Sequence, residues 1–169
     1  MLVAVDVAYS QETACAAAVC FLDWSDEKTV AEESVLLDIP ESYIPGQFYL
    51  RELPCIEKVI GLLSQTPEVV LIDGYVWLGR ASRPGLGARL YESLGQTAAV
   101  VGVAKNPLQS STHVERVFRG QSQKPLYVTS AGMDPREAAE NVLLMAGEHR
   151  IPLLLKQVDQ LARGAFQRG

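Results

Sequence analysis

Short apolar runs separated by brief polar breaks open the chain, a pattern that predicts β-strands. Residues 2–9 and 14–22 are two such runs, and the short polar connection between them predicts a hairpin. Residues 29–39 have the pattern of a third, longer strand, which Pro40 ends. A single acid, Asp6, interrupts the first run. We therefore expect three antiparallel strands at the start of the fold.

The middle of the chain changes to helical spacing and to strands that are apolar throughout. Apolar residues recur at the spacing of a helix with one buried face at Ile56, Val59, Ile60 and Leu63. Pro54 suits the first position of this helix, because the amide of that position has no partner to lose. Residues 68–74 and 98–105 are apolar almost to their ends, which is typical of central strands buried on both faces. The first of them ends near an acid, Asp73, and the second ends in a base, Lys105.

Further along, the pattern predicts one short strand and three more helices. Residues 86–94 have helical spacing and stop at a glycine, and residues 125–130 form a short apolar strand. Asp134 followed by Pro135 is a helix start, because the acid accepts hydrogen bonds from first-turn amides and the proline fits the first position. A last helix is expected over residues 153–163.

The order of these elements predicts an α/β fold, a mixed β-sheet flanked by helices. Residues 79–87 are expected to form a loop, and residues 106–119 an irregular polar segment. A chain of 169 residues is long enough to bury one core, so we expect residues 1–169 to form a single domain.

Composition excludes several classes of protein. A hydrophobic content of 48% excludes a disordered chain, and three cysteines without paired spacing indicate buried thiols in a reducing compartment. No apolar run reaches the length of a membrane span and no basic leader precedes the first strand, so we expect a cytoplasmic protein without a membrane partner. A small-molecule-binding α/β protein has little support, because glycine-rich nucleotide-binding motifs are missing. The net charge of −5 disfavours nucleic acid only mildly, since a metal-dependent nuclease needs acids at its centre.

Three carboxylates stand in unfavourable places and together indicate a metal site. Asp6 lies inside the first strand, Glu52 lies among apolar residues near the start of the first helix, and Asp73 lies at the tip of the fourth strand. If the first and fourth strands are neighbours, Asp6 and Asp73 repel each other unless a divalent cation neutralises them. Carboxylate oxygens suit Mg²⁺ or Mn²⁺, and such a site can activate water for cleavage of a phosphodiester. Lys105 would then face the scissile phosphate as a fixed positive charge.

Each of these residues also has a purely structural interpretation. Asp6 is compatible with a buried acid that pairs with an arginine or caps a turn. Arg51 and Glu52 are compatible with a solvated ion pair, and Lys105 with a solvated lysine. The two histidines stand alone among polar neighbours and are not predicted as metal ligands.

The motifs around these acids resemble those of endonuclease V, a family of deoxyinosine-directed nucleases with a ribonuclease H-like fold. The most specific match is residues 43–52, Tyr-Ile-Pro-Gly-Gln-Phe-Tyr-Leu-Arg-Glu. The similarity also covers residues 5–9, 70–74, 101–105, 130–132 and 150–152, with Asp159 behind the last of these. The resemblance thus spans most of the chain.

The resemblance implies a Mg²⁺-dependent cut of a DNA or RNA strand near a deaminated base such as inosine, with Mn²⁺ as a possible substitute. Asp6, Glu52 and Asp73 would hold the metal, and Lys105 would lie beside the phosphate. A rigid apolar wedge would fill the gap left by the everted base, whose extraction costs stacking and pairing energy. The residues expected to contact nucleic acid are Tyr43, Ile44, Pro45, Gly46, Gly74, Tyr75 and Arg83.

The chain also departs from the pattern of that family. Met133 stands where the family tends to have a histidine, and the neighbouring Asp134 either supplies a carboxylate to the site or caps the helix that follows. The loop after Asp73 contains no histidine, and its Tyr75 and Trp77 either stack on a base or pack the neighbouring loop. Two alternatives therefore stay open: a nucleic-acid-binding protein of the same fold that no longer cuts, and a related nuclease for branched or flapped strands.

Overall fold

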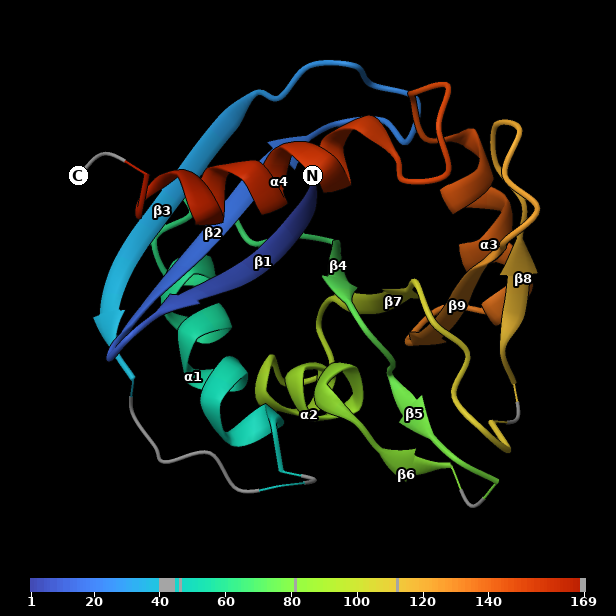
Figure 1. Ribbon diagram of the computed structural model, residues 1–169, viewed down its shortest axis with the longest axis horizontal. Coiled ribbons are helices and arrows are strands. Elements are labelled where there is room, and N and C mark those ends of the chain that lie inside the picture. Colours follow the sequence, from blue (N-terminus) through green and yellow to red (C-terminus); the bar gives the residue numbers. More distant parts are fainter. Residues whose placement is uncertain (40–44, 46, 81, 112, 168–169) are drawn as a thin grey trace.

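A seven-stranded mixed β-sheet forms the centre of the molecule, with helices on both faces (Figure 1). The computed structural model describes residues 1–39, 45, 47–80, 82–111 and 113–167. The strands are β1 (Leu2–Ser10), β2 (Thr13–Phe21), β3 (Ala31–Asp38), β4 (Val69–Asp73), β5 (Trp77–Leu78), β6 (Arg83–Pro84), β7 (Ala99–Ala104), β8 (Glu115–Val117) and β9 (Leu126–Ala131). The helices are α1 (Tyr49–Ile60), α2 (Leu86–Ser93), α3 (Pro135–Leu144) and α4 (Leu153–Gly164).

The strands of the large sheet follow the order β3-β2-β1-β4-β7-β9-β8. β1, β4 and β7 are parallel neighbours at the centre, whereas the outer pairs are antiparallel. The hairpin predicted at the start of the chain joins β1 to β2, and Gln11 in its turn has a positive φ of 53°. The predicted mixed α/β sheet is thus confirmed, and β1 and β4 are neighbours, which is the condition under which Asp6 and Asp73 were expected to meet.

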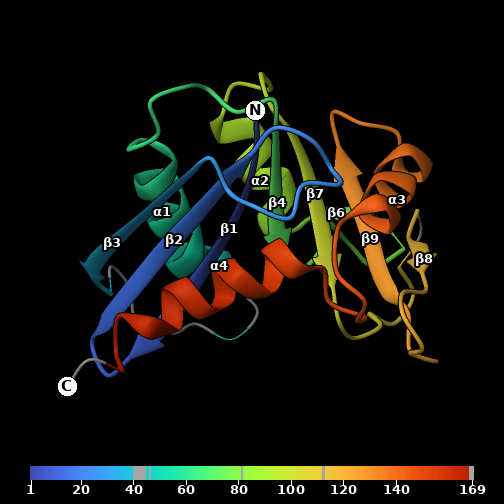
Figure 2. The ribbon, with the colours of Figure 1, turned by 90° about the horizontal axis from the view of Figure 1, so that it is seen from above.

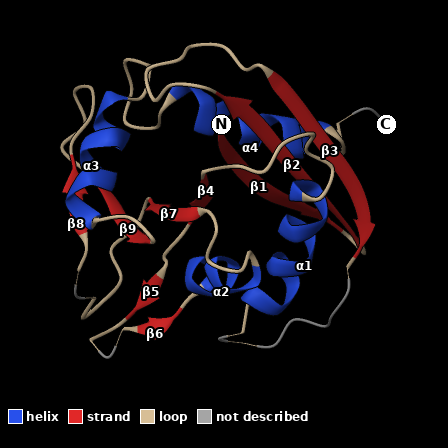
Figure 3. Cartoon of the chain, turned by 180° about the vertical axis from the view of Figure 1, so that it is seen from behind, coloured by secondary structure: helices blue, strands red, loops and turns tan. Residues whose placement is uncertain are grey.

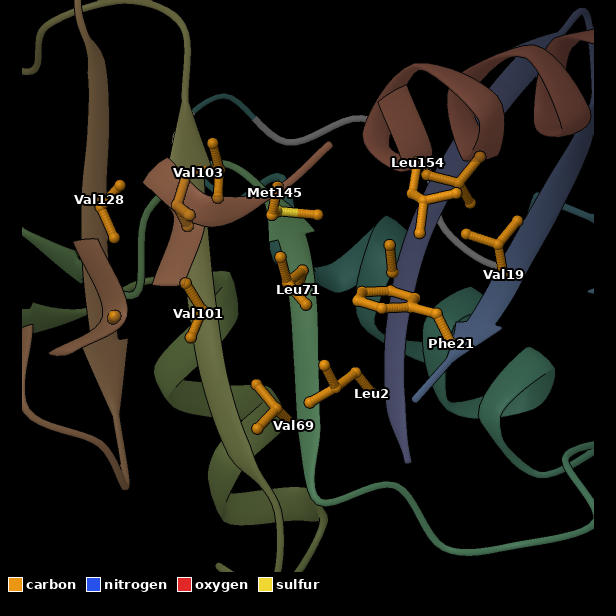
Figure 4. Close-up of a cluster of buried hydrophobic side chains, with 14 of the residues drawn as sticks. Leu2, Val19, Phe21, Val69, Leu71, Val101, Val103, Val128, Met145 and Leu154 are labelled. Atoms are coloured by element: carbon orange, nitrogen blue, oxygen red, sulfur yellow. The ribbon is translucent and has the colours of Figure 1, made fainter. Parts of the chain in front are cut away.

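Two hydrophobic cores hold the layers together, one on each face of the sheet. α1 and α2 cover one face, and α3 and α4 cover the other (Figures 2 and 3). Figure 4 shows the second core, in which Leu2, Phe21, Leu71 and Leu154 lie between the sheet and α4. Side chains alternate along a strand, so every second residue of β1 points toward α4.

α1 begins at Tyr49, so the prediction that Pro54 is its first residue is wrong. Pro54 lies inside the helix, where it removes the one hydrogen bond that its nitrogen would have donated. The first turn of α1 does not depend on the nitrogen of Pro54, because the amide of Arg51 closes this turn by donating to the carbonyl of Phe48. Glu52 consequently belongs to the first turn of α1.

The pattern also missed the shortest strands. Residues 79–87, expected as a loop, contain β6, which pairs with β5, and residues 106–119 contain β8. Strands of two or three residues are too short to show an alternation of apolar and polar residues. Whether such a segment forms a strand depends on the strand with which it pairs. β8 forms because it pairs with β9, and β5 is held by Trp77, whose indole N–H donates to the carbonyl of Ser130 (2.9 Å).

The remaining expectations about helices and thiols agree with the structure. α2 and α4 lie within a residue of their predicted bounds, and α3 starts at Pro135 as predicted, with Asp134 as its cap. All three cysteines are buried free thiols, and burial raises the pKa of each. In the described ranges, none of the helices has the length and apolar character needed to cross a membrane.

Candidate active site

Four carboxylates line one open cavity of about 700 Å³ at the end of β4: Asp6, Glu52, Asp73 and Asp159. They come from β1, α1, β4 and α4, elements that lie far apart in the chain. Aromatic side chains form another part of the wall, namely Tyr9, Phe48, Tyr49 and Tyr75. The three acids expected to act together thus share one cavity, and a fourth joins them.

The pairing of β1 with β4 explains how two of these acids meet. The strands run parallel, with Ala4 opposite Leu71 as the last paired position. Asp6 and Asp73 each lie two residues further along, on the same face of the sheet as Ala4 and Leu71. That face is covered by α4, as the core cluster around Ala4 and Leu71 shows.

Helices supply the other two acids from opposite sides of the sheet. Glu52 lies one turn before the buried residues of α1, which are Cys55, Ile56 and Val59, so the helix points it inward. Asp159 follows the buried Val158 on α4, and Arg163 one turn later donates to its Oδ1 (2.7 Å).

Burial and mutual repulsion perturb two of the acids. Burial raises the pKa of Asp6 to about 7, and the nearby charges of Asp73 and Asp159 add to the effect. Burial likewise raises the pKa of Glu52 to about 8, with the charges of Asp6 and Asp73 contributing. Asp6 accepts a hydrogen bond from the amide of Val7 (2.9 Å), but it forms no ion pair with the described residues. The arginine partner considered for Asp6 is therefore not observed in the described part of the chain.

Lys105 lies beside the acids, but it is engaged with one of them. Its Nζ is 2.9 Å from Oδ2 of Asp73, and the two side chains are 42% and 47% exposed. An exposed pair of this kind contributes little stability, about 0–1 kcal/mol. The lysine thus brings a positive charge to the open edge of the carboxylate group.

The donor atoms of this cavity fit a hard divalent cation in kind. Carboxylate oxygens without a thiol or imidazole among the acids are the ligand set that Mg²⁺ prefers. The pKa values of Asp6 and Glu52 stay raised although Arg51 lowers that of Glu52, so the positive charges of the chain do not outweigh burial and repulsion at these two acids. Among the described residues, however, no three Asp, Glu, His or Cys side chains form a preassembled ligand group.

Arginine side chains stack on two of the tyrosines that line the cavity. Arg51 lies over the ring of Tyr9 (4.5 Å to the centroid), and Phe48 meets the same ring edge-on with centroids 6.2 Å apart. Arg89 lies over the ring of Tyr49 at 3.8 Å. The ion pair considered between Arg51 and Glu52 does not form, because Arg51 stacks on Tyr9 instead.

The predicted nucleic-acid contacts are only partly within the described chain. Three of these residues lie outside the described part of the chain: Tyr43, Ile44 and Gly46. Pro40, which was expected to end the third strand, also lies outside it, and Pro45 is exposed in a turn. Two of the others, Gly74 and Tyr75, line the cavity. Arg83 is exposed on β6 and is not part of the cavity wall.

Tyr75 holds a neighbouring loop, the second of the two interpretations considered for it, whereas Trp77 is bound to strand β9. The hydroxyl of Tyr75 donates to the carbonyl of Asn106 (2.7 Å) and accepts from the amide of Leu108 (3.0 Å). The indole of Trp77 is bound to Ser130. Tyr75 thereby fixes the loop after β7 against the turn after β4, and its ring still faces the cavity.

Asp134 is a helix cap rather than a fourth carboxylate. Its Oδ1 accepts from the amides of Arg136 (2.9 Å) and Glu137 (3.4 Å), and it does not line the cavity. The fourth carboxylate is Asp159, a residue to which the sequence pattern assigned no role. Its position beside the buried Val158 on α4 gave no distinctive signal, because an acid next to the apolar stripe of a helix is common on protein surfaces.

Gly102 of β7 makes room for the turn that carries the cavity wall. A Cβ at this position would lie 2.5 Å from the carbonyl oxygen of Gly74 and 2.9 Å from Oγ1 of Thr129. We expect Gly102→Ala to lower the free energy of unfolding by roughly 1–3 kcal/mol in urea denaturation. Gly164→Ala is the control, because nothing lies within 4 Å of its added Cβ. Equal stability of the two variants would contradict this account of Gly102.

Comparison with known proteins identifies the family. The family model for endonuclease V matches residues 1–129. Endonuclease V from Thermococcus kodakarensis is 30% identical over 161 residues, which cover 95% of this chain and 77% of that protein. The crystal structure of endonuclease V from Streptomyces avermitilis is similar with a TM-score of 0.76 and 26% identity, and the match covers 98% of this chain and 81% of that one.

A third structure shares the fold at lower identity. Endonuclease V from Ciona intestinalis, in complex with DNA containing an inosine followed by a ribo-adenosine, has a TM-score of 0.82 and 19% identity, covering 99% of this chain and 86% of that one. The ribonuclease H-like mixed sheet predicted for this chain is therefore confirmed. With the family model matched over residues 1–129, the chain belongs to the endonuclease V family.

Proposed function

We propose that this protein is a divalent-metal-dependent endonuclease that cleaves a phosphodiester bond near inosine in a DNA or RNA strand. The observation that carries the proposal is the cavity lined by four carboxylates, two of which have pKa values raised to about 7 and about 8. Acids held in this way are stabilised by a bound proton or by a cation, and carboxylates of this kind bind Mg²⁺ together with phosphate oxygens.

Asp6, Glu52 and Asp73 are the proposed metal ligands, and Asp159 is a proposed fourth. Bound Mg²⁺, for which Mn²⁺ can substitute, would lower the pKa of a water and neutralise charge on the phosphate. Lys105 holds its ammonium at the edge of this group, where it would meet the charge of a phosphate. Glu52 and Asp6 are in addition the groups whose pKa values allow a proton to be held near neutral pH.

The aromatic part of the cavity is the proposed site of the extracted base. Tyr9, Phe48 and Tyr49 offer flat surfaces there, and stacking on aromatic side chains contributes about 1–3 kcal/mol per base. Gly74 leaves room for a close approach to the chain. The segment of residues 43–46 is the proposed wedge. The relative from Ciona intestinalis, bound to DNA that contains an inosine, supports inosine as the base.

A second candidate function is nucleic-acid binding without cleavage. The ion pair between Asp73 and Lys105 favours it, because it occupies one of the proposed ligands. The lack of a preassembled ligand group among the described residues points the same way. In the proposed nuclease a metal ion would take the place of Lys105 beside Asp73. In a protein that only binds nucleic acid, the ion pair between Lys105 and Asp73 would remain.

The test is a cleavage assay on end-labelled strands. Strands with one inosine and matched strands with guanosine are incubated with the protein in Mg²⁺, in Mn²⁺ or in EDTA. We expect cleavage of the inosine strand alone, and only with metal. Binding of the inosine strand without cleavage in either metal would support the second candidate. Preferential cleavage of flapped or branched strands would replace inosine as the proposed substrate feature.

A further inference from the structure

A second cavity, of about 380 Å³, adjoins the first at the carboxylates. Asp6, Asp73 and Asp159 line both cavities. The other walls of the second cavity come from the central strands β1, β4, β7 and β9, from residues 149–151 and from the first half of α4. The three acids therefore form a boundary between two separate spaces.

The two cavities differ in chemical character. Aromatic side chains line the first, whereas the second has an aliphatic wall that includes Ile72, Val103 and Leu155. Cationic and imidazole groups surround that wall: Lys105, His149, Arg150 and Lys156. The lysines and the histidine are exposed, so they lie at the rim. A chain with a net charge of −5 thus gathers basic groups beside its carboxylates.

Arg150 gives the second cavity a fixed wall. Its guanidinium donates to the carbonyls of Lys105 and Pro125, so it ties the end of β7 to the start of β9. Its Nε is buried and has no hydrogen-bond partner in the ranges that the structure describes. The hydrogen bonds to the two carbonyls hold the guanidinium in place against the backbone at the ends of two strands, and Arg150 lines the cavity as a positioned positive charge.

We propose that the second cavity binds one nucleotide of the substrate strand, on the opposite side of the scissile phosphate from the nucleotide in the first cavity. This inference rests on the proposed function, because a strand that is cut at the carboxylates continues past them in both directions. Small-ligand pockets have volumes of about 300–1,000 Å³, and this one lies near the lower limit, which suits a single nucleotide. Its aliphatic wall suits the face of a base, and the basic rim suits a phosphate.

Two pairs of variants test whether the second cavity binds a nucleotide or is only a space left by imperfect packing. Leu155→Phe reduces the volume of the second cavity, and Leu153→Phe makes the same change on an exposed residue of α4 that lines neither cavity. Lys156→Glu reverses a charge at the rim, and Lys58→Glu makes the same change on the exposed face of α1. Lys156 is exposed, so its variant tests the proposal even where Leu155→Phe perturbs the fold.

The first readout is the Kd of deoxyadenosine monophosphate for the metal-free protein, which is measured by NMR titration. We expect Leu155→Phe and Lys156→Glu to weaken binding about 5-fold or more, the equivalent of one lost contact, and both controls to bind as the wild type does. This measurement requires no catalysis. Unchanged binding in both test variants would overturn the proposal.

The second readout is the KM for inosine strands of different lengths. Strands that extend past the cut site in both directions are compared with strands that end at it on one side. We expect Leu155→Phe and Lys156→Glu to raise KM about 5-fold for the extended strands and to leave it unchanged for the strands that do not reach the second cavity. An equal effect on both kinds of strand would overturn the proposal. A wild type that binds the mononucleotide but cuts no strand would contradict the proposed function alone.

Discussion

Asp6→Asn is expected to lower the rate of cleavage by at least about 1,000-fold and, at the same time, to make the metal-free protein more stable. The loss follows because an amide cannot supply the negative charge that a Mg²⁺ ligand must provide. The gain follows because burial, together with the charges of Asp73 and Asp159, raises the pKa of Asp6, so the substitution removes a charge that the folded protein disfavours. The measurements are the cleavage rate on an inosine strand and the melting temperature in EDTA.

Asp134→Asn is the matched control for this change. Asp134 caps α3 and lies outside the cavity, and asparagine is as good a cap as aspartate. We expect this variant to keep both the activity and the melting temperature of the wild type. Addition of Mn²⁺ should raise the melting temperature of the wild type and of Asp134→Asn, but not that of Asp6→Asn. Equal stabilisation of all three proteins by Mn²⁺ would remove Asp6 from the proposed ligands.

The acids in the strands could be predicted because each interrupts an apolar pattern. Asp6 lies in the middle of a buried strand, and Asp73 ends another, so both stand out against their neighbours. Their meeting required one further step, the parallel pairing of β1 with β4, which the order of the elements allows but does not by itself dictate. Glu52 was located correctly near the start of α1, although the first residue of that helix was not.

Asp159 could not be assigned in the same way, because its role depends on where α4 lies. An acid beside the apolar stripe of a helix is common on protein surfaces, and only the crossing of α4 over β1 brings it to Asp6. The ion pair between Lys105 and Asp73 is likewise a tertiary fact, since it joins the ends of two parallel strands. The local spacing of apolar residues predicts the helices and strands. Which charged groups become partners depends on the contacts between those helices and strands.

The stability of the metal-free protein is expected to fall as the pH rises from 6 to 9. Folding raises the pKa of Asp6 to about 7 and that of Glu52 to about 8, both well above the values of about 4 for unfolded carboxyl groups. Between the unfolded and the folded pKa values, the folded state binds more protons than the unfolded state, so the free energy of unfolding decreases as the pH rises. This contribution to stability is present in full only below the unfolded pKa values. We expect a loss of roughly 2–4 kcal/mol over this range, or about 5–10 °C in melting temperature.

When the same experiment is done in Mn²⁺, the increase in melting temperature caused by the metal is expected to become larger as the pH rises. Metal ions bind deprotonated carboxylates, so the difference between the melting temperatures with and without Mn²⁺ should grow as the pH rises. The variant with both Asp6→Asn and Glu52→Gln provides the control, because it lacks the two groups that titrate and should show a flatter pH profile and little response to Mn²⁺. A wild-type profile as flat as that of the double variant would mean that these acids are not held in an unfavourable charged state. The electrostatic basis for a cation in this cavity would then be lost.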